Sequence, residues 1–195
     1  MSKSRLEAFS DGVIAILITI MVLELTAPHG DTVDALRPLI PVFLAYVLSF
    51  VVVGIYWNNH HHMLQVAERV NGKVLWANMH LLFWLSLVPF STAWMGENHF
   101  APLPAAAYGG VLFMAGLAYW ILAQALLAHH GPHSKLALAL GNDLKGKLSV
   151  VAYGAAIPFA FVHEFIALSI YVLVSLMWLV PDRRIESRVE RHPHS

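Results

Sequence analysis

A compact polar cluster stands directly before the first apolar stretch of the chain. Arg5, Ser10 and Asp11 lie within two helical turns of one another, and an uninterrupted apolar run follows over residues 12–23. A charge near hydrocarbon is costly unless it is paired inside a bundle of helices. We therefore expect the first helix to lie inside a protein assembly rather than in contact with lipid.

A second polar cluster ends the second apolar stretch, where Trp57 precedes two asparagines and three histidines. Consecutive histidines do not share a helical face, so this run alone is a poor metal site. Trp57 and His60 are one turn apart and can both meet the first helix. We expect His60 to pair with Asp11, with Arg5 completing the network. Two readings stay open: the network locks the helix ends together, or it titrates as a switch, since histidine ordinarily has a pKa of about 6.5.

An apolar stripe runs along the first helix. Ile16, Ile20 and Leu23 are spaced i, i+4, i+7 and share one face, with Thr19 on its flank. One reading is that these side chains are bundle core. The other is that they line a pore as stacked apolar rings, which gate or select by forcing ions to shed water. Because the run 12–23 covers only ~18 Å, a place at the centre of an assembly is favoured.

Three further features concern helix packing. Asn78, in the third apolar stretch, is polar at membrane depth and is expected to bond to a neighbouring helix. Pro89 removes a backbone donor and is expected to kink the same helix. Gly109, Gly110 and Gly116 in the fourth stretch indicate close helix packing rather than a ligand site.

Composition defines the compartment and excludes several classes of protein. Of the 195 residues, 58% are hydrophobic and 12% charged, a balance typical of an all-α integral membrane protein. The net charge of zero argues against a nucleic-acid partner. The sequence contains no His-Glu-x-x-His, Gly-x-Ser-x-Gly or Walker motif, so we expect no catalytic residue, cofactor, metal site or enzymatic activity. It also lacks the Thr-Val-Gly-Tyr-Gly filter of ordinary potassium channels.

Six apolar segments are each near the roughly 20 residues that a spanning helix needs. They cover residues 9–27, 38–58, 74–95, 103–128, 146–162 and 165–180. Residues 148–180 contain no lysine or arginine and could also form one long helix. Basic residues flank both ends of this stretch, and the positive-inside rule then requires an even number of crossings, with a tight turn at His163 and Glu164. The interpretation is one six-helix domain, 1–182, followed by a short cytoplasmic tail, 183–195.

The basic residues also predict orientation. With the N-terminus in the cytoplasm, all of the 12 lysine and arginine residues except Arg37 fall inside. Both termini are therefore expected in the cytoplasm. Residues 129–147 are rich in glycine and read as a flexible cytoplasmic loop.

The residues of both polar clusters resemble a known family. Residues 5–11, Arg-Leu-Glu-Ala-Phe-Ser-Asp, match the Arg-x-x-x-Phe-Ser-Asp motif of the prokaryotic relatives of the endosomal and lysosomal transmembrane potassium channel. Trp57, His60, Asn78 and Pro89 resemble further family positions, and the resemblance covers essentially the whole membrane domain.

The resemblance implies a homotetramer in which the first helix of each six-helix subunit surrounds the pore. The implied constriction comprises Ile16, Ile20 and Leu23, with Thr19 as a hydroxyl layer. The implied cytoplasmic network comprises Arg5, Phe9, Ser10, Asp11, Trp57, His60 and Asn78. Ala15 stands where the eukaryotic relative has a serine, which leaves Thr19 as the sole hydroxyl near the constriction.

The expected function is a potassium-permeable cation channel in a prokaryotic cell membrane, passing potassium and other monovalent cations. A proton-conducting or proton-coupled protein is the alternative. The lysosomal relative resembles both a potassium channel and a proton-conducting protein, and this chain has 12 histidines. A structural or sensory membrane protein without flux is a third class that the sequence leaves open.

Overall fold

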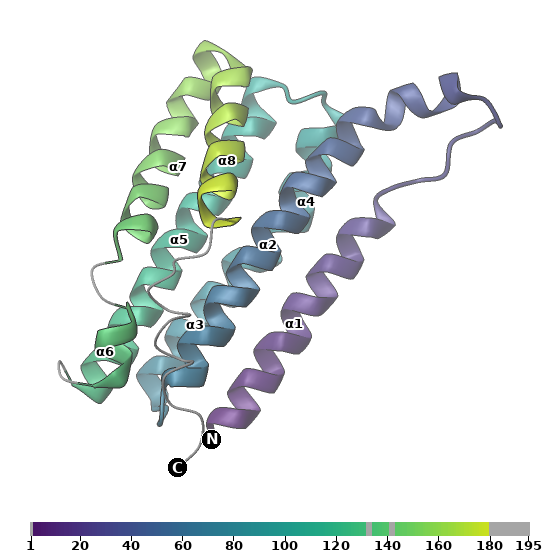
Figure 1. Ribbon diagram of the computed structural model, residues 1–195. Coiled ribbons are helices and arrows are strands. Elements are labelled where there is room, and N and C mark those ends of the chain that lie inside the picture. The colour runs from purple at the N-terminus through teal and green to yellow at the C-terminus, as the bar shows by residue number, and fades with distance from the viewer. Residues whose placement is uncertain (1, 132–133, 141–142, 180–195) are drawn as a thin grey trace.

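The protein is a bundle of helices (Figure 1). The computed structural model describes residues 2–131, 134–140 and 143–179, so the expected tail 183–195 lies outside the described residues. The helices are α1 (Lys3–Leu23), η1 (Val33–Leu39), α2 (Ile40–Val66), α3 (Gly72–Ser86), α4 (Val88–Glu97), α5 (Pro102–His130), α6 (Lys135–Leu140), α7 (Leu144–Val162) and α8 (Glu164–Leu179). The expected all-α class is confirmed.

Helix α5 is the hub of the bundle and packs against α3, α4, α7 and α8. Helix α1 packs against α2, α3 and α4 instead. Figure 1 shows α1 on one side of the molecule and α7 on the other, with α2 and α5 between them. The first helix thus lies at an edge of the single chain, with one side covered by its own subunit.

Among the described residues, four helical stretches are long and apolar enough to cross a membrane: Lys3–Leu23, Val33–Val66, Gly72–Glu97 and Pro102–His130. Helix α8, Glu164–Leu179, is a shorter apolar helix of 16 residues. Helix α1 starts earlier than the apolar run 9–27 implied, so the polar motif lies within the helix and not before it.

The third stretch is broken where a proline was expected to kink it. Helix α3 ends at Ser86 and α4 starts at Val88, with Pro89 in the first turn of α4. Proline donates no backbone hydrogen bond, and its ring clashes with the carbonyl four residues earlier. The chain tightens at this point, because the Leu87 amide donates to the Trp84 carbonyl, three residues back, at 3.2 Å. The distortion expected at Pro89 is therefore observed as a break between α3 and α4.

The C-terminal stretch consists of two helices. His163 adopts an extended conformation between α7 and α8, and its amide donates to the Phe159 carbonyl at 2.9 Å. The single long helix over 148–180 is therefore excluded. The expectation of a loop over 129–147 was wrong in part, since α5 continues to His130 and α6 forms a short helix within the segment.

Small residues allow α5 to approach its neighbours closely. A side chain on Gly109 would collide with the hydroxyl of Tyr171, which donates to the Ala105 carbonyl at 2.9 Å. A side chain on Gly116 would crowd Val150 of α7. Gly110 faces open space, so close packing is confirmed for two of the three glycines.

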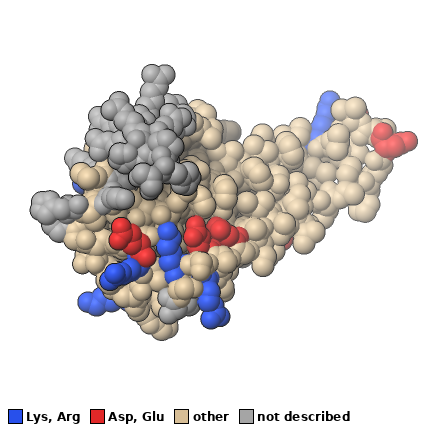
Figure 2. Space-filling view, turned by 60° about the horizontal axis from the view of Figure 1, so that its bottom comes forward, with Lys and Arg blue, Asp and Glu red and all other residues tan. Residues whose placement is uncertain are grey.

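Charged side chains gather at one end of the bundle. Figure 2 shows them on the end that lies at the bottom of Figure 1, where α1 begins. At the opposite end, Arg37 and Asp34 of η1 form an ion pair of 3.1 Å, and both side chains are exposed. The apolar body between the two ends matches the hydrocarbon layer of a membrane.

We predict that Gly109→Ala destabilises the bundle by about 1–3 kcal/mol, because the added methyl group displaces Tyr171 from a well-packed interface. The matched control is Gly110→Ala, where the added methyl group meets nothing within 4 Å. The melting temperature in detergent, followed by size exclusion after heating, measures the difference. Equal losses in the two variants would contradict the packing assigned to Gly109.

Candidate functional site: the seam between α1 and its neighbours

Three polar contacts join α1 to α2 at successive turns. Lys3 Nζ donates to the Gln65 carbonyl at 2.9 Å, and Glu7 Oε1 lies 3.5 Å from His61 Nδ1. Asp11 Oδ1 accepts from Trp57 Nε1 at 3.0 Å. The partners advance by four residues on α1 while they retreat by four on α2. The contacts form a ladder along two antiparallel helices, and we call them the α1–α2 ladder.

A second network lies beneath this ladder and is fully buried. Ser10 Oγ donates to the Leu6 carbonyl at 2.8 Å and accepts from Asn78 Nδ2 at 2.9 Å. Asn78 Oδ1 then lies 2.7 Å from His60 Nε2. Ser10, His60 and Asn78 come from α1, α2 and α3, so the network ties three helices together. Asn78 bonds to its neighbouring helices as expected.

The direction of these bonds determines the tautomer of His60. Asn78 uses its amide donor toward Ser10, so its oxygen is the atom that faces His60. An amide oxygen only accepts, so His60 Nε2 carries a proton. In the neutral ring, Nδ1 then carries a lone pair and can only accept a hydrogen bond. This buried atom has no hydrogen-bond partner among the described residues.

The expected pairing of His60 with Asp11 was wrong. Asp11 bonds to Trp57, and His60 bonds to Asn78. The reason is helical geometry: three residues turn a helix through roughly 300°, so His60 points about 60° away from Trp57 and toward α3. Arg5 is exposed and makes no ion pair with the described acidic residues of its own chain, so its expected place in the network stays a prediction.

The apolar stripe of α1 faces away from the bundle. Ile16, Ile20 and Leu23 are 57%, 41% and 78% exposed. The opposite face, which carries Leu6, Ser10, Ile14, Leu17 and Met21, is buried against the neighbouring helices. Within one chain, the reading of the stripe as bundle core is therefore wrong.

Two other side chains share the uncovered side of α1. Phe9 is 46% exposed and lies at its charged end. Thr19 is exposed as well, and its hydroxyl donates to the Ile16 carbonyl at 2.8 Å. With its proton held by its own helix, the threonine oxygen offers lone pairs outward.

Sequence reasoning placed Trp57 against the first helix but missed the contacts of Lys3 and Glu7. Lys3, Glu7 and Asp11 are spaced by four residues, and this regular spacing was a signal that all three meet the same neighbouring helix. It also missed a buried polar layer that joins α2, α4 and α5. Thr92 Oγ1 of α4 donates to Ser49 Oγ of α2 at 2.7 Å, and Ser49 Oγ donates to the Tyr108 hydroxyl of α5 at 3.0 Å.

The connection between α2 and α3 is clipped by the end of α5. His130 Nε2 accepts from the backbone amides of Glu68 and Arg69 at 3.0 and 3.2 Å, and Nδ1 contacts the Leu126 carbonyl at 2.9 Å. Asn71 bonds to His129 at 3.1 Å and also caps α3. The clip positions the start of α3, and with it Asn78 in the buried network.

Removing the amide at the centre of the buried network should destabilise the chain. We predict that Asn78→Ala costs about 1–3 kcal/mol, because His60 Nε2–H loses its buried acceptor. Asn58→Ala is the control, since Asn58 is exposed on α2. Thermal stability in detergent is the measurement, and an Asn78 variant as stable as the control would contradict the network.

Known proteins resemble this chain in sequence and in fold. Residues 5–89 match the family described as endosomal/lysosomal potassium channel TMEM175. A Chryseobacterium protein named a potassium channel is 51% identical over 192 residues, covering 98% of this chain and 100% of that protein. The human endosomal/lysosomal proton channel TMEM175 is 36% identical over 96 residues, covering 43% of this chain and 19% of that protein.

A solved structure has the same fold. The crystal structure of a lysosomal potassium-selective channel TMEM175 homologue from Chamaesiphon minutus superposes with a TM-score of 0.80 at 26% identity, covering 91% of this chain and 96% of that chain. The relatives are named as channels, which agrees with the expectation that the chain is not an enzyme. Because the Chryseobacterium protein matches over its full length, the chain belongs to the TMEM175 family.

Proposed function

We propose that this chain is a potassium-permeable cation channel, a homotetramer whose pore is lined by α1. The observation that carries the proposal is the uncovered stripe of Ile16, Ile20 and Leu23 on a helix whose other face is held by α2, α3 and α4. Further copies of the chain would cover this stripe. The names of the bacterial relatives support potassium as the permeating ion.

The constriction would work by dehydration. Rings of isoleucine and leucine offer an ion no replacement for its water, so passage depends on pore width and on the polar groups next to the rings. Thr19 would supply the nearest polar ring, because it is exposed on α1 directly before Ile20. The apolar stretch is short, which concentrates the barrier within a few turns of α1.

The ladder and the buried network would set the rotation of α1. One residue of helical register corresponds to roughly 100° of rotation, enough to turn Ile16 from the pore toward the bundle. Asp11, Trp57 and the Ser10–Asn78–His60 bonds hold α1 against this rotation from its charged end. Arg5 and Phe9, which are exposed at that end, would meet neighbouring subunits.

The proposed topology has six spans in the domain 1–182, formed by α1, α2, the broken helix α3–α4, α5, α7 and α8. The charged end in Figure 2 would face the cytoplasm, in agreement with the positive-inside rule. Both termini would then be cytoplasmic, in a prokaryotic cell membrane.

Proton conduction is the second candidate. The human relative is named a proton channel. The buried Nδ1 of His60, which has no hydrogen-bond partner in the described part of the chain, is an atom that can accept a proton. Liposomes loaded with potassium and a pH dye separate the candidates. Internal acidification that requires an added protonophore reports potassium flux, and acidification that requires added valinomycin reports proton flux. Absence of both would overturn the channel proposal.

We predict that Ile16→Asn and Leu23→Asn each raise potassium flux several-fold and weaken discrimination against sodium, because a polar ring holds water where an apolar one expels it. Leu173→Asn is the control, an exposed leucine on α8. Flux from the same liposomes is the measurement. If the two α1 variants behave like the control, the pore lies elsewhere.

We predict that Asp11→Ala lowers the yield of tetramer on size exclusion. The charged acceptor of the Trp57 indole is lost, and a hydrogen bond to a charged group contributes about 1.5–3 kcal/mol. Asp31→Ala, in the exposed segment between α1 and η1, should assemble normally. If the Asp11 variant assembles normally but its flux is altered, the contact controls gating of the channel rather than assembly of the tetramer.

A further inference from the structure

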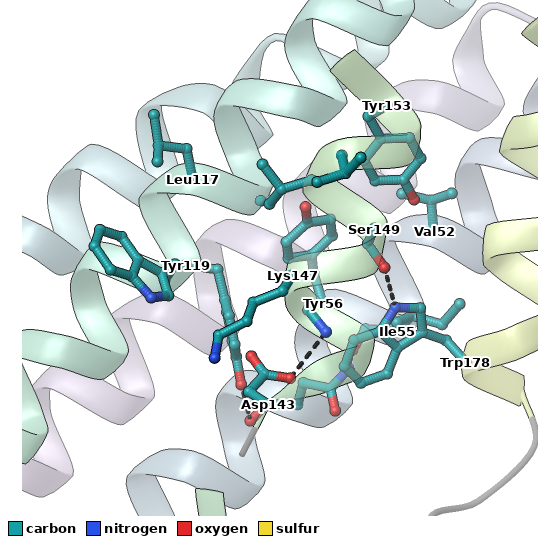
Figure 3. A pocket seen from close by; sticks show the side chains of 16 residues that line it. Val52, Ile55, Tyr56, Leu117, Tyr119, Asp143, Lys147, Ser149, Tyr153 and Trp178 are labelled. Atoms are coloured by element: carbon teal, nitrogen blue, oxygen red, sulfur yellow. Dashed lines mark hydrogen bonds between the residues drawn. The ribbon is translucent and has the colours of Figure 1, made fainter. Parts of the chain in front are cut away.

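A cavity lies on the far side of the bundle from α1. It has a volume of about 350 Å³, which lies within the range of roughly 300–1,000 Å³ typical of ligand pockets. Helices α2, α5 and α7 form its walls, and Trp178 of α8 closes one side (Figure 3). Most of its lining is apolar, including Val52, Ile55 and Leu117.

Polar groups are concentrated where α7 begins. Asp143 caps α7 by accepting from the Gly146 amide at 2.9 Å. Lys147 follows one turn later on the same face and also lines the cavity (Figure 3). Nearby, Trp178 Nε1 donates to Ser149 Oγ at 2.9 Å. The cavity therefore has an apolar body and one end that carries both an acidic and a basic side chain.

The cavity opens toward the outer surface of the bundle. Trp120 and Val151, which border it, are 44% and 68% exposed, and Lys147 is exposed as well. Figure 1 places α7 opposite α1, so this surface faces away from the stripe on α1. In a membrane, an apolar opening on this side meets lipid, and the first turn of α7 lies at the level where its charged residues reach water.

We propose that this cavity binds one phospholipid whose headgroup carries both a phosphate and an ammonium group, of the phosphatidylethanolamine type. One acyl chain occupies the apolar body between α2, α5 and α7. Lys147 contacts the phosphate, and Asp143 contacts the ammonium group. Charge complementarity supports this headgroup, because one end of the cavity offers a basic side chain for the phosphate and an acidic side chain for the ammonium group. The proposal does not depend on the location of the pore.

The test is native mass spectrometry of the full-length protein in nanodiscs that contain equal amounts of phosphatidylethanolamine and phosphatidylglycerol. The parent protein should keep one phosphatidylethanolamine per subunit after the bulk lipid is removed. Lys147→Gln should reduce this retention at least several-fold. Asp143→Asn keeps an oxygen that can cap α7 but removes the charge, so it should shift retention toward phosphatidylglycerol.

A cavity-filling variant tests the acyl-chain site separately. Ile55→Trp should abolish retention of the lipid, and Leu148→Trp, on the exposed face of α7 outside the cavity, should not. Lys147→Gln changes an exposed side chain, so it reports on binding even if the tryptophan variant fails to fold. The proposal is overturned if the parent retains no lipid, if Lys147→Gln retains as much as the parent, or if Asp143→Asn leaves the headgroup preference unchanged.

Discussion

Lys3, Glu7 and Asp11 contact α2 at three successive turns, and this ladder decides which face of α1 the subunit covers. The covered face continues the ladder with apolar side chains such as Ile14 and Leu17. On the other face, Ile16, Ile20 and Leu23 are exposed. A helix with one face held and the other exposed can only be completed by other molecules, and the proposed pore follows from that asymmetry.

The two halves of the bundle differ in how much each depends on polar contacts between helices and on close packing. Around α1–α4, buried hydroxyl, amide and imidazole groups bond across helices, as in Ser10–Asn78–His60. Interhelical hydrogen bonds of this kind are an attractive force between helices in lipid, where apolar side chains gain nothing from leaving water. Around α5, α7 and α8, close packing at Gly109 lets the Tyr171 ring approach the backbone of α5. The second half therefore combines close packing at glycine with hydrogen bonds from Tyr171 and Trp178.

Local effects made much of the fold predictable. The break at Leu87 follows from Pro89, whose effect reaches only one turn back. The break at His163 was predicted from the basic residues at both ends of the stretch. Because these residues belong on the same side of the membrane, the stretch must cross it twice and therefore turn in the middle. The short helix α6 was missed, since glycines at both ends of its segment indicate a loop and nothing local marks the helix between them.

The sequence by itself determined that this is an all-α membrane protein, which residues form its apolar stretches, and which polar residues stand at the head of the first helix. These properties depend on composition and on neighbours along the chain. Only the tertiary structure decided that His60 bonds to Asn78 and Asp11 to Trp57, and that the Ile16 stripe is uncovered. Those choices depend on how each helix is rotated about its axis, and helical periodicity defines faces without saying which neighbour each face will meet.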